Sequence, residues 1–400
     1  MPRKSIGFFK RHQWFMYSAI LTGMVFSLVG CDTIPVLDTS KLPSTPPWQQ
    51  PLPPTPRATP TSSPAPAPTT IPAPVQPTII SQPVPAPTAP APAMPQTRGP
   101  YLNYPEMRQF IAEMSRKHGF NRNTLEKIFS TVPRGNEVLA KVKAPAEAKP
   151  WRSYRPIFLT EDRIRGGVDF WRKNRASLDN AARQFGVDPA YIVAIIGVET
   201  AYGRNVGKYN VLQSLTTLAF DYPARQDFYR KELEQFLLLT REENINPHRL
   251  VGSYAGAMGI SQFISSSYRH YAVDFNNDRR RDLWRAADAI GSVANYFKKH
   301  KWKRGGDVAV PAQVSGYRFE SMADTKAKAP RYTLDQLRNA GVRPLGRFWS
   351  AKVSLIKLVG TRDTEYWIGG ENFYTITRYN HSPTYARAVH QLAQAIRSRV

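Results

Sequence analysis

Glu199 is the residue of this sequence whose surroundings best suit acid–base chemistry. It ends an apolar stretch that begins at Asp188-Pro189, a favourable N-cap followed by a favourable first helical residue. We therefore expect a helix that carries Glu199 on the same face as Ile195 and Ile196. An ionised carboxylate is costly on an apolar face and beside a helix C-terminus, so Glu199 is a candidate proton donor. The alternative is a structural ion pair or a solvated helix end.

Carboxylates are absent from two segments that could lie near Glu199. Residues 200–220 and 251–273 contain neither Asp nor Glu. Most glycoside hydrolases use two carboxyl groups, one as the acid and the other as the base or nucleophile. If Glu199 is the only carboxyl group of the site, a mechanism that needs two carboxyl groups is excluded. The alternative is that Asp169 or Asp221 folds into the site.

A second candidate segment, Gly252 to Phe263, combines three glycines with other small residues before a helix. Glycine lets a ligand approach the main chain closely. Ser253 and Gln262 offer neutral donors and acceptors that suit sugar hydroxyls and acetamides. The segment is equally typical of a tight packing site between helices.

The spacing of apolar residues predicts a mainly α (α+β) protein with a small β-containing insert. We expect helices over residues 105–118, 123–129, 160–185, 188–199, 226–243, 260–271, 286–300 and 382–398. Strand-like patterns cover residues 307–310, 350–359, 365–368 and 373–377.

Three separated blocks resemble the membrane-bound lytic transglycosylase B family of the lysozyme-like superfamily. They are Ile195–Thr200, Gly252–Gln262 and Asp288–Phe297, within a resemblance that covers about residues 101–400. The resemblance implies a lysozyme-like helical catalytic domain in which Glu199 is the catalytic acid and base. By the same resemblance, the substrate-binding residues are Tyr154, Arg225, Ser253, Gln262, Tyr296, Tyr379, Asn380 and Tyr385. One departure is Ala224, which stands where the family can have a second arginine before Arg225.

The function implied by the resemblance is non-hydrolytic cleavage of peptidoglycan. The β-1,4 bond between N-acetylmuramic acid and N-acetylglucosamine would break with formation of a 1,6-anhydro ring, and Glu199 would act first as acid and then as base. This chemistry requires no cofactor. The alternatives are a hydrolytic muramidase on the same fold and a non-catalytic peptidoglycan-binding lipoprotein.

A loop after residue 273 resembles the family's EF-hand-like calcium loop. Asp274, Asn276 and Asp278 would be the metal ligands at positions 1, 3 and 5. However, Arg279 stands where the turn glycine belongs and Arg285 where the last acidic ligand belongs. We therefore expect weak calcium binding or none.

The first hundred residues have the composition of an export and anchoring region. Residues 1–30 read as a lipoprotein signal peptide, with a basic start, a short apolar run and a lipobox-like Leu28-Val29-Gly30 before Cys31. Cys31 is the only cysteine, so lipidation is its expected role. Residues 31–100 hold most of the 35 prolines and form an extended linker. Residues 101–400 would be the catalytic domain, with its small β-containing part at about 303–380. A single-pass N-terminal anchor is the alternative for residues 1–31.

The formal net charge of +25 predicts a polyanionic partner. An exported chain without nucleic-acid-binding motifs is expected to meet peptidoglycan rather than nucleic acid. We expect a monomeric periplasmic lipoprotein that is bound to a membrane through lipidated Cys31. The outer membrane is expected rather than the inner membrane. Cell-wall synthases are candidate protein partners.

Overall fold

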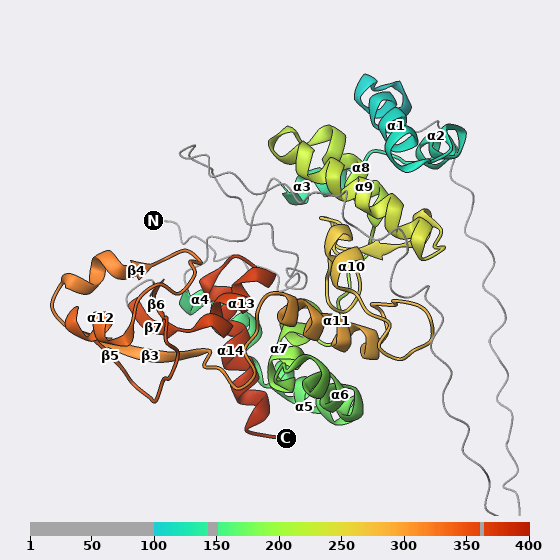
Figure 1. Cartoon of the computed structure of the whole chain (residues 1–400). Helices are drawn as coiled ribbons and strands as arrows, with labels where there is room; N and C mark the ends of the chain where they lie inside the picture. The colour runs from blue at the N-terminus through green and yellow to red at the C-terminus, as the bar shows by residue number, and fades with distance from the viewer. Residues whose placement is uncertain (1–99, 143–150, 361–363) are drawn as a thin grey trace, which may run out of the picture. The chain divides into compact units, whose positions relative to one another are not determined.

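The computed structural model describes residues 100–142, 151–360 and 364–400, and these residues form a mainly helical structure with a five-stranded sheet and a two-stranded ribbon (Figure 1). Cys31, the signal segment and the proline-rich linker lie outside the described residues. The first helices are α1 (Pro105–His118), α2 (Arg122–Ser130), α3 (Asn136–Val142), α4 (Trp151–Phe158), α5 (Glu161–Lys173), α6 (Arg175–Phe185) and α7 (Pro189–Thr200). The others are α8 (Val211–Asp221), α9 (Gln226–Glu242), α10 (Ser265–Tyr271), α11 (Ala286–Lys299), α12 (Leu334–Asn339), α13 (Glu371–Tyr379) and α14 (Pro383–Arg397). Short 3-10 helices occupy Pro100–Asn103, Pro223–Arg225, Pro247–Arg249 and Arg318–Met322.

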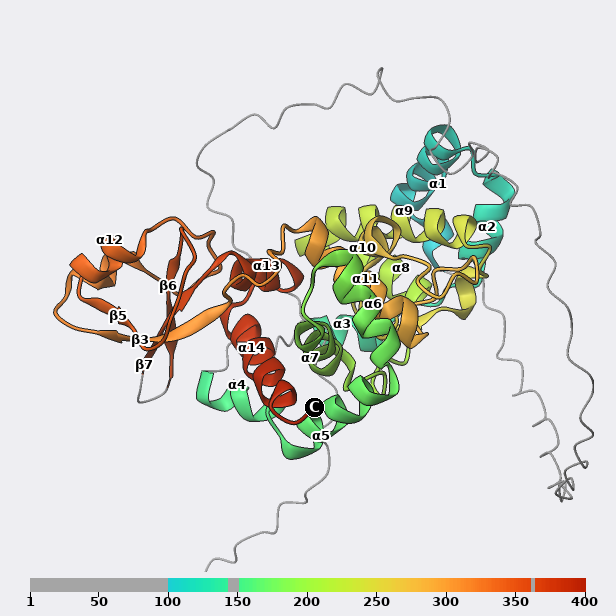
Figure 2. The same ribbon diagram turned by 60° about the horizontal axis from the view of Figure 1, so that its bottom comes forward.

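Helix α7 is the centre of the helical core. The Asp188 side chain accepts a hydrogen bond from the Ala190 backbone N–H at 2.9 Å, and Pro189 occupies the first turn, as the sequence predicts. Every residue from Ala190 to Thr200 is buried. The sequence predicted one apolar face, whereas the structure buries this helix on all sides. Helices α14, α5, α11 and α6 pack against α7, and Figure 2 shows α14 beside it.

Two predicted helices begin or divide at other places. The long helix expected over residues 160–185 is broken at Asn174, whose side-chain amide donates to the Phe170 carbonyl at 2.8 Å and ends α5. The helix expected from Ile260 begins only at Ser265, because Gln262 adopts a left-handed φ of 53° that no continuous helix allows.

The predicted strand over residues 373–377 is wrong, because this segment is helix α13. Its residues are rich in β-formers, but Phe373 and Ile376 lie one helical turn apart and are buried. α13 packs against α14 and contacts β7. Tertiary packing therefore overrides local β-propensity here.

The larger sheet has the strand order β4-β6-β7-β3-β5, antiparallel except where β4 runs parallel to β6. Its strands are β3 (Ala309–Val314), β4 (Ala323–Asp324), β5 (Val342–Pro344), β6 (Ser354–Val359) and β7 (Thr364–Gly369). Phe319, Leu337 and Leu355 belong to a separate small core on this sheet. β6 contacts α14, so the sheet joins the helical core through the helices that follow it. A two-stranded ribbon pairs β1 (Tyr209–Asn210) with β2 (Val251–Gly252).

Candidate active site

Glu199 lies one residue before the end of α7 and is only 8% exposed. Ala201 caps the helix in the left-handed region with φ 51°, and Tyr202 follows with φ 65°. The backbone N–H groups of these two residues donate to the Gly197 and Ile196 carbonyls at 3.1 and 3.3 Å. Such a C-terminal turn redirects the chain immediately after the carboxylate, at a cost of about 1–2 kcal/mol for each non-glycine residue held there.

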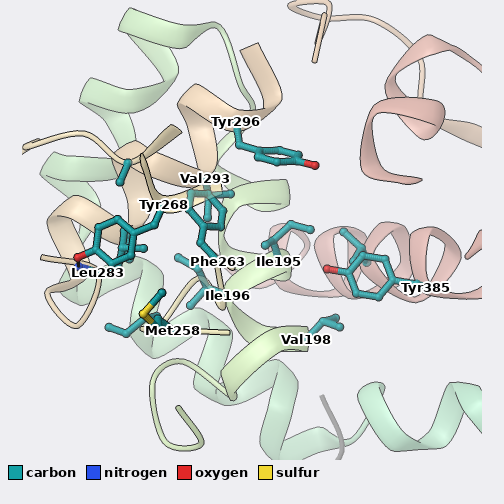
Figure 3. Close-up of a cluster of buried hydrophobic side chains, with 14 of the residues drawn as sticks. Ile195, Ile196, Val198, Met258, Phe263, Tyr268, Leu283, Val293, Tyr296 and Tyr385 are labelled. Atoms are coloured by element: carbon teal, nitrogen blue, oxygen red, sulfur yellow. Dashed lines mark hydrogen bonds between the residues drawn. The ribbon is translucent and has the colours of Figure 1, made fainter. Parts of the chain in front are cut away.

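The hydroxyl of Tyr385 donates a hydrogen bond to Oε1 of Glu199 at 2.5 Å. Tyr385 is in the first turn of α14, whose N-cap Ser382 accepts its backbone N–H at 3.3 Å. Burial, and next the negative charge of Glu199, raise the pKa of the Tyr385 phenol well above its usual value. The phenol therefore stays protonated and donates. Figure 3 shows Tyr385 projecting from α14 toward α7.

Tyr379 and Tyr296 form an aromatic cluster beside this pair. Their ring centroids are 4.8 Å apart, and each packs on Phe263. The Tyr379 hydroxyl donates to the Ser261 carbonyl at 2.6 Å, and that of Tyr296 donates to the Arg378 carbonyl at 2.5 Å. Both hydroxyls thus hold backbone in place, so these tyrosines connect α13 and α11 to the glycine-rich segment.

The glycine-rich segment from Gly252 to Gln262 is a set of tight turns rather than a helix. Ser253 Oγ accepts the backbone N–H of Ala257 at 3.0 Å, and Gln262 Nε2 donates to the Val206 carbonyl at 3.1 Å. Gly259 has φ 71°, and a Cβ there would lie 2.5 Å from the Cβ of Leu283. These close approaches require glycine.

Thr200 joins the glycine-rich segment to the end of α7. Its hydroxyl donates to the Ile260 carbonyl at 2.9 Å and accepts the Gly203 backbone N–H at 3.0 Å. Because Thr200 follows Glu199 directly, these bonds hold the end of α7 beside Ile260 of the glycine-rich segment.

Asn380, Tyr154 and Arg225 are the other predicted substrate-binding residues. Asn380 is buried, and its Oδ1 has no hydrogen-bond partner among the described residues, as expected for an acceptor that binds a ligand. Tyr154 is half-buried, and its ring centroid lies 5.0 Å from that of Phe158. It also contributes to the raised pKa of the Tyr385 phenol. Arg225 is held by cation–π contact over Phe228 at 4.3 Å, on the segment after α8.

Neither alternative carboxylate is available as a catalytic partner of Glu199. Asp221 accepts hydrogen bonds from Tyr101 at 2.8 Å and from Arg134 at 3.0 Å. These bonds join the end of α8 to the first helices of the described chain. Asp169 is an exposed residue of α5. Both placements are compatible with a site that uses one glutamate, which stays a prediction.

Glu232 is a buried acid that the sequence analysis missed. Its carboxylate accepts the backbone N–H of Ser266 at 2.9 Å and the Ser266 hydroxyl at 2.7 Å, which caps α10. Burial raises the pKa of Glu232 above its ordinary value. The signal was its place on the apolar face of α9, between Tyr229 and Phe236.

Three carboxylates converge in the predicted calcium loop. Oxygens of Asp274, Asp278 and Asp288 lie within 4.8 Å of one another. Asn276 belongs to the same turn, where its Oδ1 accepts the Asp278 N–H at 3.0 Å. Arg279 adopts the left-handed φ of 68° that a glycine was expected to supply. Clustered hard oxygen ligands of this kind fit a divalent cation such as calcium.

Asp288 is an acid that the sequence analysis did not assign to this loop, where it expected Arg285 in the place of the last acidic ligand. Asp288 lies in the first turn of α11, and its oxygens accept the N–H groups of Phe275 and Asp282 at 2.8 Å. Arg285 instead lies beside the loop, with its Nε 3.4 Å from Asp282 Oδ2. The sequence count assumed a 12-residue loop, whereas the chain reaches its last acid three residues later.

A hollow of about 400 Å³ between α4, α5 and α14 does not contain Glu199. Arg155, Ile164 and Gln391 line it, on residues unrelated to the predicted site. This hollow therefore does not bear on the proposed role of Glu199.

A helical core that holds one buried glutamate at the end of its central helix, beside tyrosines and a polar glycine-rich segment, defines an enzyme of the lysozyme-like class. Residues 103–394 match the family described as the transglycosylase SLT domain. The chain belongs to this family and is a transglycosylase.

Relatives with known structures or curated names agree with this assignment. The membrane-bound lytic murein transglycosylase B of Escherichia coli K12 is 46% identical over 315 residues, which are 75% of this chain and 85% of that protein. The catenated lytic transglycosylase SltB1 of Pseudomonas aeruginosa is 46% identical, with a TM-score of 0.71 over 75% of this chain and 100% of that chain. The Escherichia coli lytic transglycosylase Slt35 in complex with calcium is 45% identical, with a TM-score of 0.69 over 76% of this chain and 96% of that chain.

Proposed function

We propose that this transglycosylase cleaves peptidoglycan at the β-1,4 bond between N-acetylmuramic acid and N-acetylglucosamine, without water. The observation that carries the proposal is the buried Glu199 carboxyl, held at 2.5 Å by the Tyr385 hydroxyl. Asp221 is engaged by Tyr101 and Arg134, so one carboxyl group must serve both halves of the reaction. The lytic murein transglycosylases among its relatives support the substrate class.

In the first half of the reaction, Glu199 is the general acid. The Tyr385 hydroxyl donates to Oε1 and orients the carboxyl group. The protonated carboxyl group gives its proton to the glycosidic oxygen as the bond from the muramyl C1 to that oxygen breaks. The N-acetylglucosamine leaves with a free hydroxyl, and the muramyl acetamide oxygen bonds to C1 and takes up the positive charge that develops there.

In the second half, Glu199 is the general base. Its carboxylate removes the proton from the C6 hydroxyl of the same muramyl sugar, and that oxygen bonds to C1 as the acetamide oxygen departs. The product is a 1,6-anhydro ring, and Glu199 is again protonated. No water is consumed, and no cofactor takes part.

The proposed substrate contacts use the polar and aromatic side chains around Glu199. Asn380 Oδ1, buried without a partner among the described residues, suits an N–H donor such as the acetamide. Ser253 and Gln262 present polar groups on turns tied to α7, and Tyr154 offers a ring near Tyr385. Tyr296 and Tyr379 support the same surface, while Arg225 supplies a cation for muramyl or peptide carboxylates.

The test is product analysis of purified peptidoglycan digested by the full chain and by its Glu199→Gln variant. Mass spectrometry should find anhydro-muramyl ends with the native chain, and Glu199→Gln should bind the glycan but release nothing. Reducing ends from the native chain would support the hydrolytic muramidase instead. Binding without release by the native chain would support the non-catalytic lipoprotein.

We propose that the loop after residue 273 holds calcium in a structural role. Its ligands would be the carboxylates of Asp274, Asp278 and Asp288 with the Asn276 side chain. The calcium complex of Slt35, a relative at 45% identity, supports this assignment. The ion would fix the loop before α11 and supplies no step of the reaction.

We propose that the enzyme works in the periplasm as a lipoprotein. Residues 1–30 would be removed as a signal peptide, Cys31 would carry the lipid, and residues 31–100 would link it to the catalytic domain of residues 101–400. No helix in the part of the chain that the structure describes is long and apolar enough to cross a membrane. The relative's name, membrane-bound, supports attachment. Fractionation should find the native chain in the outer membrane and Cys31→Ala in the soluble periplasm.

A further inference from the structure

We propose that Tyr202 is a positioning residue for Glu199. Its ring, seated against three glycines, holds the left-handed turn that ends α7 and so sets the direction of the catalytic carboxyl group. This inference rests on the proposed role of Glu199 and names a residue that does not itself touch the substrate.

The turn after Glu199 needs an external support. Ala201 and Tyr202 have φ values of 51° and 65°, in the left-handed region that favours glycine. Two consecutive residues other than glycine keep such φ values only when contacts with the surrounding structure hold the backbone in place. The chain after Gly203 continues to Val206, whose carbonyl accepts Gln262 Nε2 at 3.1 Å. The direction of the turn therefore affects both Glu199 and the polar segment beside it.

The Tyr202 side chain lies in a slot lined by glycines of α5 and α7. A Cβ at Gly197 or at Gly167 would come within 2.6 Å of the Tyr202 hydroxyl oxygen. A Cβ at Gly166 would come within 3.1 Å of the ring. On the open side the ring meets Phe170, with centroids 5.7 Å apart. The absence of three β-carbons is what lets the ring fold back onto the helix that carries Glu199.

Hydrogen bonds close the slot. The Tyr202 hydroxyl donates to the Arg163 carbonyl at 2.8 Å, and the Arg163 guanidinium donates to the Gly197 carbonyl. α5, the last turn of α7 and Tyr202 thus form one closed ring of contacts. Gly197 lies two residues before Glu199, so the end of α7 is held on the Tyr202 side.

Thr200 holds the opposite side of the same turn. Its hydroxyl donates to the Ile260 carbonyl at 2.9 Å and accepts the Gly203 N–H at 3.0 Å. Glu199 therefore sits between two backbone anchors, one at Tyr202 and one at Thr200. Loss of the Tyr202 anchor frees the turn while the glycine-rich segment keeps its own hydrogen bonds.

The experiment compares Tyr202→Ala with Tyr101→Ala, both in the full-length chain. Tyr101 is a control because it is likewise a tyrosine with a hydrogen-bonded hydroxyl, 3.0 Å from Thr217, but it is fully buried and packs among the first helices. Turnover of peptidoglycan is normalised to the folded fraction. We expect Tyr202→Ala to lower kcat at least 10-fold and Tyr101→Ala to leave it within 2-fold. Tyr202→Phe, which keeps the ring in the slot, should retain at least a third of the native kcat.

A glycan-binding measurement separates positioning from general disorder of the site. In a Glu199→Gln background, which removes turnover, Tyr202→Ala should change the Kd for insoluble peptidoglycan by less than 2-fold. Loss of binding in step with loss of kcat would overturn the inference, because a collapsed site would explain both.

A double-mutant cycle tests the slot itself. Gly197→Ala should lower kcat at least 10-fold in the presence of Tyr202, because its Cβ would collide with the phenol. In a Tyr202→Ala chain the same substitution should cost less than 2-fold further. Additive effects would overturn the inference. If Glu199→Gln retains turnover, the proposed function fails; if Glu199→Gln is inactive but Tyr202→Ala turns over like Tyr101→Ala, only the role of Tyr202 fails.

Discussion

The hydroxyl oxygen of Tyr385 lies 2.5 Å from Oε1 of Glu199, although 186 positions separate the two residues. Glu199 is in the last turn of α7 and Tyr385 in the first turn of α14, and the two helices pack against each other. A neutral phenol thus contacts one oxygen of the Glu199 carboxyl group, for which we propose the catalytic role. This partner can donate to the carboxyl group whether that group is protonated or ionised.

Tyr385→Phe should lower kcat roughly 10- to 100-fold with little change in glycan binding. The substitution keeps the ring but removes a hydrogen bond to a charged group, worth about 1.5–3 kcal/mol. Steady-state kinetics on purified peptidoglycan measure the effect. Tyr374→Phe is the control, since that half-buried hydroxyl on α13 accepts a 3.4 Å bond from Arg378 and does not contact Glu199 in any described hydrogen bond. Equal kcat values for the two variants would show that the bond to Glu199 does not matter.

Calcium should stabilise the native chain against heat, and Asp288→Asn should remove most of that stabilisation. Binding to the folded state alone raises its stability by RT ln(1 + [Ca²⁺]/Kd), about 2.7 kcal/mol at 100 Kd. Thermal unfolding with calcium and with chelator measures the difference. Asp335→Asn, an exposed acid of α12, should leave the calcium response intact. An undiminished response in Asp288→Asn would exclude this carboxylate as a ligand.

Acidification should destabilise the fold through His390. Burial, and next the charge of Arg387, lower the pKa of His390 from 6.5 to about 3. Because the unfolded chain takes up the proton first, the stability contributed by neutral His390 is complete above pH 6.5. It is lost progressively as the pH falls from 6.5 toward 3, with about 2 kcal/mol lost between pH 7 and pH 5.

Urea unfolding of the native chain and of His390→Asn at pH 7 and pH 5 measures this contribution. Asparagine keeps a polar group near the Tyr191 hydroxyl, which lies 2.7 Å from His390 Nδ1, but does not titrate. The variant should show a smaller loss of unfolding free energy on acidification. The same loss in both chains would assign the pH dependence to other groups.

Glu232→Ala should destabilise the protein by about 1–3 kcal/mol, because it leaves the Ser266 N–H and hydroxyl without their buried acceptor. Glu232→Gln keeps one acceptor oxygen and should cost less. Denaturant unfolding of the two variants gives both values. If Glu232→Ala is as stable as Glu232→Gln, the cap on α10 is not a stabilising contact.

Features that depend on neighbours in the chain were predictable. The start of α7 followed from Asp188 and Pro189, whose capping and fixed φ act within one helical turn. Glu199 was recognisable because its apolar stretch and its family block are contiguous. The strand-like pattern of residues 373–377 gave a wrong prediction, because the segment is helix α13. Phe373 and Ile376 of this helix are buried against residues that are distant in the sequence.

The residues alone were enough to predict that one glutamate ends an apolar helix, that a glycine-rich polar segment follows, and which family the chain belongs to. The folded chain was needed to show that Tyr385 contacts Glu199, that Tyr202 folds back onto Gly197, and that Asp288 joins the acidic loop. Helix caps and family blocks depend on residues within a few positions of each other. Contacts across long separations depend instead on where helices pack and turns redirect the chain, and the printed order of residues does not reveal those positions.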